Sequence, residues 1–144
     1  PILMRLQSSM VDLVTQGLAG NLPTQANWDA RPALGIVIAS KGYPETSSKG
    51  DVISGLPALD CAAQSDVKVF HAGTDFIADS GDNAQSVGEK QTITNGGRVL
   101  CVTALADSIL EAQQAALAVA GAISFEGAQY RRDIGHHAIM RKST

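Results

Sequence analysis

The run RVLCVTAL, residues 98–105, constrains the fold more than any other stretch of the chain. Over 99–105 an extended segment would present apolar side chains on both of its faces. Because a strand of this kind must be covered on both sides, we expect it at the centre of a sheet. The preceding QTIT, 91–94, is separated from it by Asn95, Gly96 and Gly97. The two segments are therefore expected to form either a strand pair or one long bent strand.

Shorter apolar segments and two amphipathic stretches surround this central strand. Three- and four-residue spacing predicts one helix over 3–19, followed by a connector that Trp28 fastens to the core. Ser108 and Glu111 form a capping box for a second helix, which runs to about Ala120 and stops at Gly121. Further strands are expected at 33–40, 51–57, 67–74, 75–79 and 122–125. Many short strands with two packed helices indicate an α+β fold with a mostly antiparallel sheet.

Composition excludes several classes of protein. The chain has 144 residues, 44% of them apolar and 17% charged, which fits a globular domain with a real core. A net charge of −3 argues against a dedicated nucleic-acid binder, and no apolar run approaches the roughly 20 residues of a membrane helix. Two cysteines, Cys61 and Cys101, are too few for a disulfide framework or a zinc site. A reduced, cytoplasmic setting is expected.

The corner Asn95-Gly96-Gly97-Arg98 has the residue types of an anion site. Glycines allow backbone N–H groups to converge on an anion, and Arg98 would add a forked, permanently charged donor that matches phosphate oxygens. The alternative is a hairpin or bulge in which the glycines supply positive φ and Arg98 is solvated. Gly-Gly-Arg alone is a weak signal, and the residues leave both interpretations open.

Other polar residues give weaker indications. Lys41-Gly42-Tyr43-Pro44 and Lys49-Gly50-Asp51 follow a strand and form either a substrate-facing loop or an ordinary surface loop. His71 is interpreted as a hydrogen-bonded structural residue, and the adjacent His136 and His137 are poor candidates for a shared metal. The sequence contains no P-loop, dinucleotide fingerprint, HExxH, GxSxG or CxxC motif. No residue is therefore assigned a catalytic or metal-binding role.

Several segments read together carry a family resemblance. KVFHAGT at 68–74, TNGGRVLCVTAL at 94–105 and RRDIGH at 131–136 occur in this order, after GYP at 42–44. The chain resembles the C-terminal part of phosphoribosylamine–glycine ligases, ATP-grasp enzymes of purine synthesis. Its start resembles the segment that follows the family's "DPETQ" motif. The resemblance implies that residues 1–30 are the last helix of the ATP-grasp region with a connector, and that 31–144 form the substrate-side domain.

The resemblance also implies a reaction. In the family, ATP phosphorylates the glycine carboxylate, and the amine of 5-phosphoribosylamine attacks the resulting glycyl phosphate. Magnesium is held upstream of "DPETQ", so this chain would lack the metal ligands and most of the nucleotide pocket. Carried over, the sugar-phosphate contact falls on Gly97 and Arg98, with Asn95 and Gly96 shaping the loop. Lys41 to Pro44 and Lys49 to Asp51 would line the same cleft.

Two positions depart from the family pattern, and two other functions stay open. Glu45 stands where the family commonly has Gly, which suggests different backbone angles, and His137 stands where Arg is common. Because the chain begins at Pro1 and not at Met, it is expected to be a piece of a longer protein that is inactive alone. The alternatives are a stand-alone ligand-binding or assembly module with the same shape, and a structural domain of another ATP-grasp enzyme.

Overall fold

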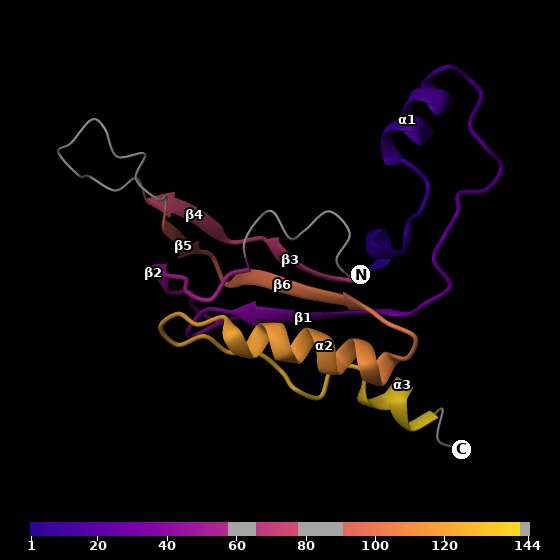
Figure 1. Ribbon diagram of the computed structural model, residues 1–144. Helices are drawn as coiled ribbons and strands as arrows, with labels where there is room; N and C mark the ends of the chain where they lie inside the picture. The colour runs from indigo at the N-terminus through magenta and orange to yellow at the C-terminus, as the bar shows by residue number, and fades with distance from the viewer. Residues whose placement is uncertain (58–65, 78–90, 142–144) are drawn as a thin grey trace.

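A computed structural model describes residues 1–57, 66–77 and 91–141. Two three-stranded antiparallel sheets carry the fold, with strand orders β1-β6-β3 and β2-β5-β4 (Figure 1). The expected α+β class is therefore confirmed. The elements are a 3₁₀ helix η1 (Ile2–Arg5), α1 (Met10–Leu18), β1 (Ala33–Ala39), β2 (Lys49–Val52), β3 (Val67–His71), β4 (Thr74–Ile77), β5 (Gln91–Asn95), β6 (Arg98–Leu105), α2 (Ile109–Ala122) and α3 (His136–Arg141).

Strand β6 is the central strand of the larger sheet, as its two apolar faces predicted. It pairs with β1 on one side and with β3 on the other. Ile36, opposite Val102 in this ladder, and Val102 itself are fully buried beneath α2, whereas Val37 on the other face is 42% exposed. The sheet thus has one face covered by α2 and one face that is only partly covered, by η1.

Helix α2 lies close on the sheet because its inner face carries only small side chains. In Figure 1 α2 lies along β1, and its Ala112, Ala116 and Ala120 are fully buried. The predicted cap is present: Ser108 Oγ accepts a hydrogen bond from the Glu111 N–H at 3.2 Å. The predicted stop at Gly121 is wrong by one residue, since the helix continues to Ala122 and ends where Ile123 turns extended.

The chain passes between the two sheets at two neighbouring bends. Strand β5 lies in the smaller sheet and β6 in the larger, so the bend at Gly96 and Gly97 joins sheets and is no hairpin. Of the two arrangements expected for 91–105, the bent continuation is therefore the observed one. Likewise β4 does not return along β3; it pairs with β5. The predicted loop 79–90 lies outside the described residues.

The N-terminal stretch differs most from expectation. The single helix expected over 3–19 is split into η1 and α1, because Leu6 bridges to Trp28 and the Gln7 N–H donates to the Asn27 carbonyl at 2.9 Å. Ser9 then caps α1 by accepting from the Asp12 N–H. Helix α1 has no buried residue, and it stands apart from the sheets in Figure 1. Trp28 is 46% exposed and does not join the core.

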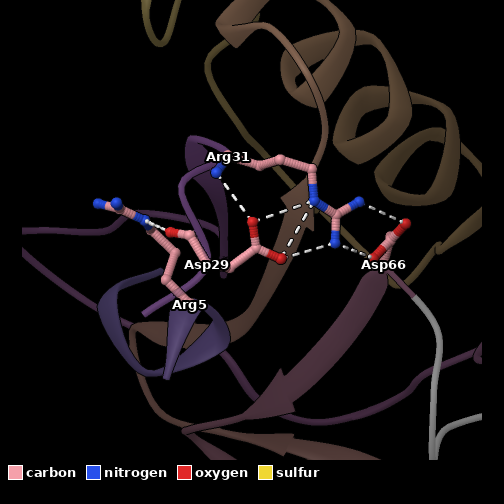
Figure 2. A network of polar contacts seen from close by, with 4 residues as sticks. All are labelled: Arg5, Asp29, Arg31 and Asp66. Atoms are coloured by element: carbon pink, nitrogen blue, oxygen red, sulfur yellow. Dashed lines mark hydrogen bonds and ion pairs between the residues drawn. The ribbon is translucent and has the colours of Figure 1, made fainter. Parts of the chain in front are cut away.

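An ion-pair network fastens this N-terminal stretch to the larger sheet (Figure 2). Arg31 binds the Asp29 carboxylate through Nη2 at 2.9 Å and the Asp66 carboxylate, just before β3, through Nη1 at 3.0 Å. Arg5 Nε donates to the Asp29 carbonyl at 3.0 Å. The hydrogen bonds from Arg31 lower the pKa of the Asp29 carboxyl below its ordinary value. The network therefore ties η1, the connector and the start of β3 together.

Residues after α2 form a strap across the end of β1. The strand expected at 122–125 is reduced to one bridge, between Ser124 and Ser54. Gln129 then makes a second bridge, with Ala39 of β1. The described part of the chain ends in α3, and His136 and His137 are its first two residues. Their ring centroids are 5.7 Å apart.

Candidate functional site

The bend between β5 and β6 is pressed against the bend between β3 and β4. The Gly73 N–H donates to the Arg98 carbonyl at 2.9 Å, and the Asn95 N–H donates to the Gly73 carbonyl at 2.7 Å. A Cβ at Gly73 would lie 2.9 Å from the Gly96 Cα and 2.8 Å from the Arg98 carbonyl oxygen. The two backbones can approach this closely only because Gly73 and Gly96 have no side chain.

Gly97 serves a similar purpose on its other side. A Cβ at this position would overlap the Tyr43 ring. Neither Gly96 nor Gly97 has positive φ, so the alternative in which these glycines supply a left-handed conformation is wrong. In the loop before β2 a positive φ falls on Gly42 and not on Glu45, and Gly50 within β2 also has a positive φ. The corner glycines are thus required for close approach, with Tyr43 packed on Gly97.

The polar groups of the corner fall into two sets, those already bonded and those free. The carbonyl of Gly97 accepts from the Ser40 N–H at 2.9 Å, and that of Arg98 is held by Gly73. The N–H groups of Gly96 and Gly97 donate no hydrogen bond to another described residue. Arg98 is exposed, and its guanidinium makes no hydrogen bond or ion pair with the described part of the chain. Two backbone donors and one cation are therefore available to a ligand.

Of these three residues, Gly97 and Arg98 line a cleft on the partly covered face of the larger sheet. One section, of about 530 Å³, is lined by Val37, Tyr43, Ala72, Gly97, Arg98, Leu100 and Cys101. A second section, of about 420 Å³ and more apolar, is lined by Gly35, Val37, Ala39, Tyr43, Gln129, Tyr130, Arg131 and Ile134. Tyr43 and Val37 line both sections. The cleft can therefore take an anion at one end and a less polar group at the other.

The remaining site residues expected from the sequence gather around this corner. Lys49 is paired with Asn95 in the β2–β5 ladder, and both are exposed. Asn95 Nδ2 donates to the Asp75 carboxylate at 3.3 Å, which fits a role in shaping the loop. Lys41 is exposed on the same loop as Tyr43 and Pro44. Lys41, Lys49 and Arg98 make no ion pair with another described residue, and of these three only Arg98 lines the cleft.

Asp51 has a bracing role in the structure. Its carboxylate accepts from the hydroxyl of Ser48 and, at 3.2 Å, from that of the fully buried Thr94. The Asp51 N–H donates to Thr94 Oγ1 at 3.0 Å. These bonds fix β2 to β5 immediately before the Gly96–Gly97 bend. Asp51 therefore supports the corner, with its carboxylate already occupied by two hydroxyls.

Several residues of the site carried no recognisable signal in the sequence. Gln129, Val37 and Ala72 come from three segments far apart in the chain and meet at the cleft only after folding. His71, expected to be structural, bonds through Nδ1 to Thr74 Oγ1 at 3.1 Å. No group of three or more His, Cys, Asp or Glu that could hold a metal ion occurs within the described residues. Within the same residues, no helix has the length and apolarity to cross a membrane.

Comparison with known proteins shows to which family the chain belongs. The family model described as "Phosphoribosylglycinamide synthetase, C domain" matches residues 33–137, from the first residue of β1 into α3. The chain belongs to this family. Phosphoribosylamine–glycine ligase of Vibrio cholerae is 48% identical over 143 residues, and that of Xanthomonas campestris is 49% identical over the same length. The resemblance seen in the short motifs is thereby confirmed across the chain.

A solved structure supports the same conclusion. The crystal structure of phosphoribosylamine–glycine ligase from Thermotoga maritima superposes with a TM-score of 0.62 at 30% sequence identity, covering 86% of this chain. The chain spans 30% of the length of each of the two bacterial ligases and 27% of the Thermotoga chain. What is similar to these enzymes is thus one part of each, the part that the family description calls the C domain.

Proposed function

We propose that this chain is the C-terminal part of an ATP-dependent ligase that joins glycine to 5-phosphoribosylamine, forming glycinamide ribonucleotide for purine synthesis. The chain's own share of that work is to hold the sugar phosphate. The observation that carries this proposal is the corner at Gly96, Gly97 and Arg98. Its two N–H groups and its guanidinium have no partner among the described residues, and Gly97 and Arg98 line one section of the cleft. In a member of this family, a phosphate is the anion that these donors suit.

The proposed reaction divides between this chain and the rest of the protein. ATP transfers its γ-phosphoryl group to the glycine carboxylate, and the amine of phosphoribosylamine attacks the acyl carbon and expels phosphate. Holding the 5-phosphate at Arg98 would fix one end of the sugar and present the amine at its other end to the acyl phosphate. The proposal assigns ATP and magnesium mainly to residues that precede this segment in the longer protein. A cytoplasmic location is part of the proposal.

Arg98→Ala in the full-length ligase tests the site directly. Loss of a charge-assisted phosphate contact worth about 1.5–3 kcal/mol should raise KM for phosphoribosylamine by about one to two decades. KM for ATP and for glycine should stay within about twofold of the parent. Arg141→Ala is the matched control, because Arg141 is an exposed arginine at the end of α3 that lines neither section of the cleft. An unchanged KM for phosphoribosylamine in Arg98→Ala would remove the corner from the site.

We further propose that residues 1–30 pack with the nucleotide-binding part of the longer protein, whereas 31–144 form the substrate-side domain. Two observations support this division: the family match begins at residue 33, and α1 contributes nothing to the core. Eight large apolar side chains of this stretch are exposed, namely Ile2, Leu3, Met10, Val11, Val14, Leu18, Leu22 and Trp28. A surface of this kind is typical of one that is covered by another part of a protein.

The rival function, a stand-alone ligand-binding or assembly module, makes a different prediction for the same apolar surface. A module that works alone would leave α1 exposed, so the encoded protein would begin close to Pro1. A ligase would encode a nucleotide-binding region before it. Sequencing the gene upstream of the codon for Pro1 distinguishes the two, because a start codon there contradicts the ligase and a long upstream reading frame contradicts the module.

A further inference from the structure

The side chain of Gln129 brackets the turn that carries Tyr43. Its Nε2 donates to the Ser40 carbonyl at 3.0 Å and to the Tyr43 carbonyl at 3.3 Å. The Tyr43 N–H also donates to the Ser40 carbonyl, at 3.3 Å, so both ends of the turn are held. Because both partners are carbonyl oxygens, only the NH₂ of the amide can face them. One amide group therefore closes the turn from outside.

The strap that carries Gln129 is itself fixed to the sheet. The Ala39 N–H donates to the Gln129 carbonyl at 2.8 Å, and the Gln129 N–H donates to the Ala39 carbonyl at 3.0 Å. Two residues earlier, Gly127 has a φ of 66°, and a Cβ there would lie 2.6 Å from the Lys41 Cβ. The strap thus contacts the loop at both Lys41 and Tyr43, and it cannot slide without breaking the bridge to β1.

The Ser40–Tyr43 turn supports the corner formed by Gly96, Gly97 and Arg98, which is called the anion corner below. The Ser40 N–H donates to the Gly97 carbonyl at 2.9 Å, and the Tyr43 ring covers the face of Gly97 where a side chain would stand. Displacement of the turn would therefore free Gly97 on two sides. Gly97 is followed directly by Arg98, so the direction of the guanidinium and of the Gly97 N–H depends on this support.

We propose that Gln129 is a positioning residue for the anion corner: it clamps the Ser40–Tyr43 turn, which holds Gly97 and Arg98 in the geometry that binds a sugar phosphate. This inference rests on the proposed function. Gln129 acts through Tyr43 and Gly97 and does not itself reach the anion. Gln129 lies in the strap, at least 31 residues later in the chain than the residues of the turn and the corner that it supports.

The test compares two glutamines whose side-chain amides both donate to backbone carbonyls, Gln129 on the strap and Gln113 on α2. Gln129→Leu removes the clamp on the turn. Gln113→Leu removes a side-chain bond from α2 to the strap, from Nε2 to the Ile134 carbonyl at 2.6 Å, and leaves the turn untouched. Both variants are made in the full-length ligase beside Arg98→Ala, and Gln129→Glu is made as a second variant of similar size whose ionised side chain cannot donate. Thermal melting checks that each protein folds.

Two readouts separate positioning from a merely structural role. Amide hydrogen exchange should accelerate in the peptides covering 40–46 and 95–98 for both Gln129 variants and not for Gln113→Leu. KM for phosphoribosylamine should rise about three- to tenfold for the Gln129 variants, with KM for ATP within about twofold, because only one substrate uses the corner.

Each other result overturns the inference in a recognisable way. Unchanged exchange at 40–46 means that Gln129 does not hold the turn. Faster exchange with an unchanged KM for phosphoribosylamine, where Arg98→Ala raises it, means that Gln129 is structural and the corner tolerates its loss. If Arg98→Ala also leaves KM unchanged, the proposed phosphate site is wrong and the positioning role is lost with it.

Discussion

Two helices of this chain, α1 and α2, were expected from the same kind of evidence and have opposite surroundings. Both follow apolar spacing, and both begin at a serine cap. Helix α2 buries Ala112, Ala116 and Ala120 completely, whereas α1 buries no residue. The apolar pattern of a helix therefore predicts that one face is to be covered, and says nothing about which segment covers it.

Residue size distinguishes the two helices better than periodicity does. The buried face of α2 is made of alanines, so the helix can lie close on β1 and β6, where Ile36 and Val102 fill the space. The outward side chains of α1 are large, with Val11 at 73% and Leu18 at 87% exposure. Large apolar side chains in solvent support the proposal that α1 packs against another part of a longer protein.

The largest effect on the free energy of unfolding is predicted for a glutamate placed in α2, compared with one placed in α1. Ala116→Glu puts a carboxylate where no water reaches, and should cost more than about 4 kcal/mol in the free energy of unfolding or prevent folding. Val11→Glu changes an exposed position of α1 and should stay within about 0.5 kcal/mol. Denaturant titration of the 144-residue chain measures both. Equal losses would show that α1 is as much a part of this domain as α2.

A smaller effect is expected at the corner. Gly97→Ala introduces a methyl group that overlaps the Tyr43 ring, and should cost about 1–3 kcal/mol in the free energy of unfolding. In a Tyr43→Ala background the same change should cost much less, because the ring is gone. A double-mutant cycle measured by denaturant titration gives the coupling. A cycle that shows no coupling would contradict the packing of Tyr43 on Gly97.

The smallest effect concerns the Arg31–Asp29 ion pair, which is part of the network that fastens the N-terminal stretch to the larger sheet. Arg31 lowers the pKa of Asp29, whose ordinary value is 3.8, so the folded form holds its carboxylate charge to lower pH than the unfolded form. The stability from this pair is fully present above the unfolded pKa and is lost as the pH falls through the lowered one. Asp29→Asn should flatten the acid side of the stability profile, below about pH 4. Denaturant titrations across pH 2–6 check this, and a profile as steep as the parent's would mean that the pair does not act.

Strand positions were largely predictable from sequence, and sheet membership was not. The central place of β6 followed from its two apolar faces, since an eight-residue strand with such faces has few alternatives. The assignment of β4 and β5 to a second sheet depends on the close contact of Gly73 with Gly96, which is a long-range contact. Helix 3–19 was overpredicted because periodicity continues through Leu6, where the chain is diverted to Trp28.

At the candidate site, the corner residues could be singled out from the sequence and their supports could not. Gly96, Gly97 and Arg98 have the residue types of an anion site, and their role in binding an anion stays a prediction. Gln129 did not, because a glutamine in a polar segment has no pattern until folding brings it to the Tyr43 carbonyl. The need for glycine at position 97 could not be predicted either, because Tyr43, whose ring excludes a side chain there, is 54 positions away in the sequence.

A crystal structure of the full-length ligase with ribose 5-phosphate tests the central claim most directly. Ribose 5-phosphate carries the phosphate and sugar of the proposed substrate without the reactive amine. The account predicts that the phosphate lies within hydrogen-bonding distance, about 2.7–3.2 Å, of the Arg98 guanidinium and of the Gly96 or Gly97 N–H. A phosphate bound elsewhere, with the guanidinium of Arg98 free or paired to a carboxylate, would contradict it.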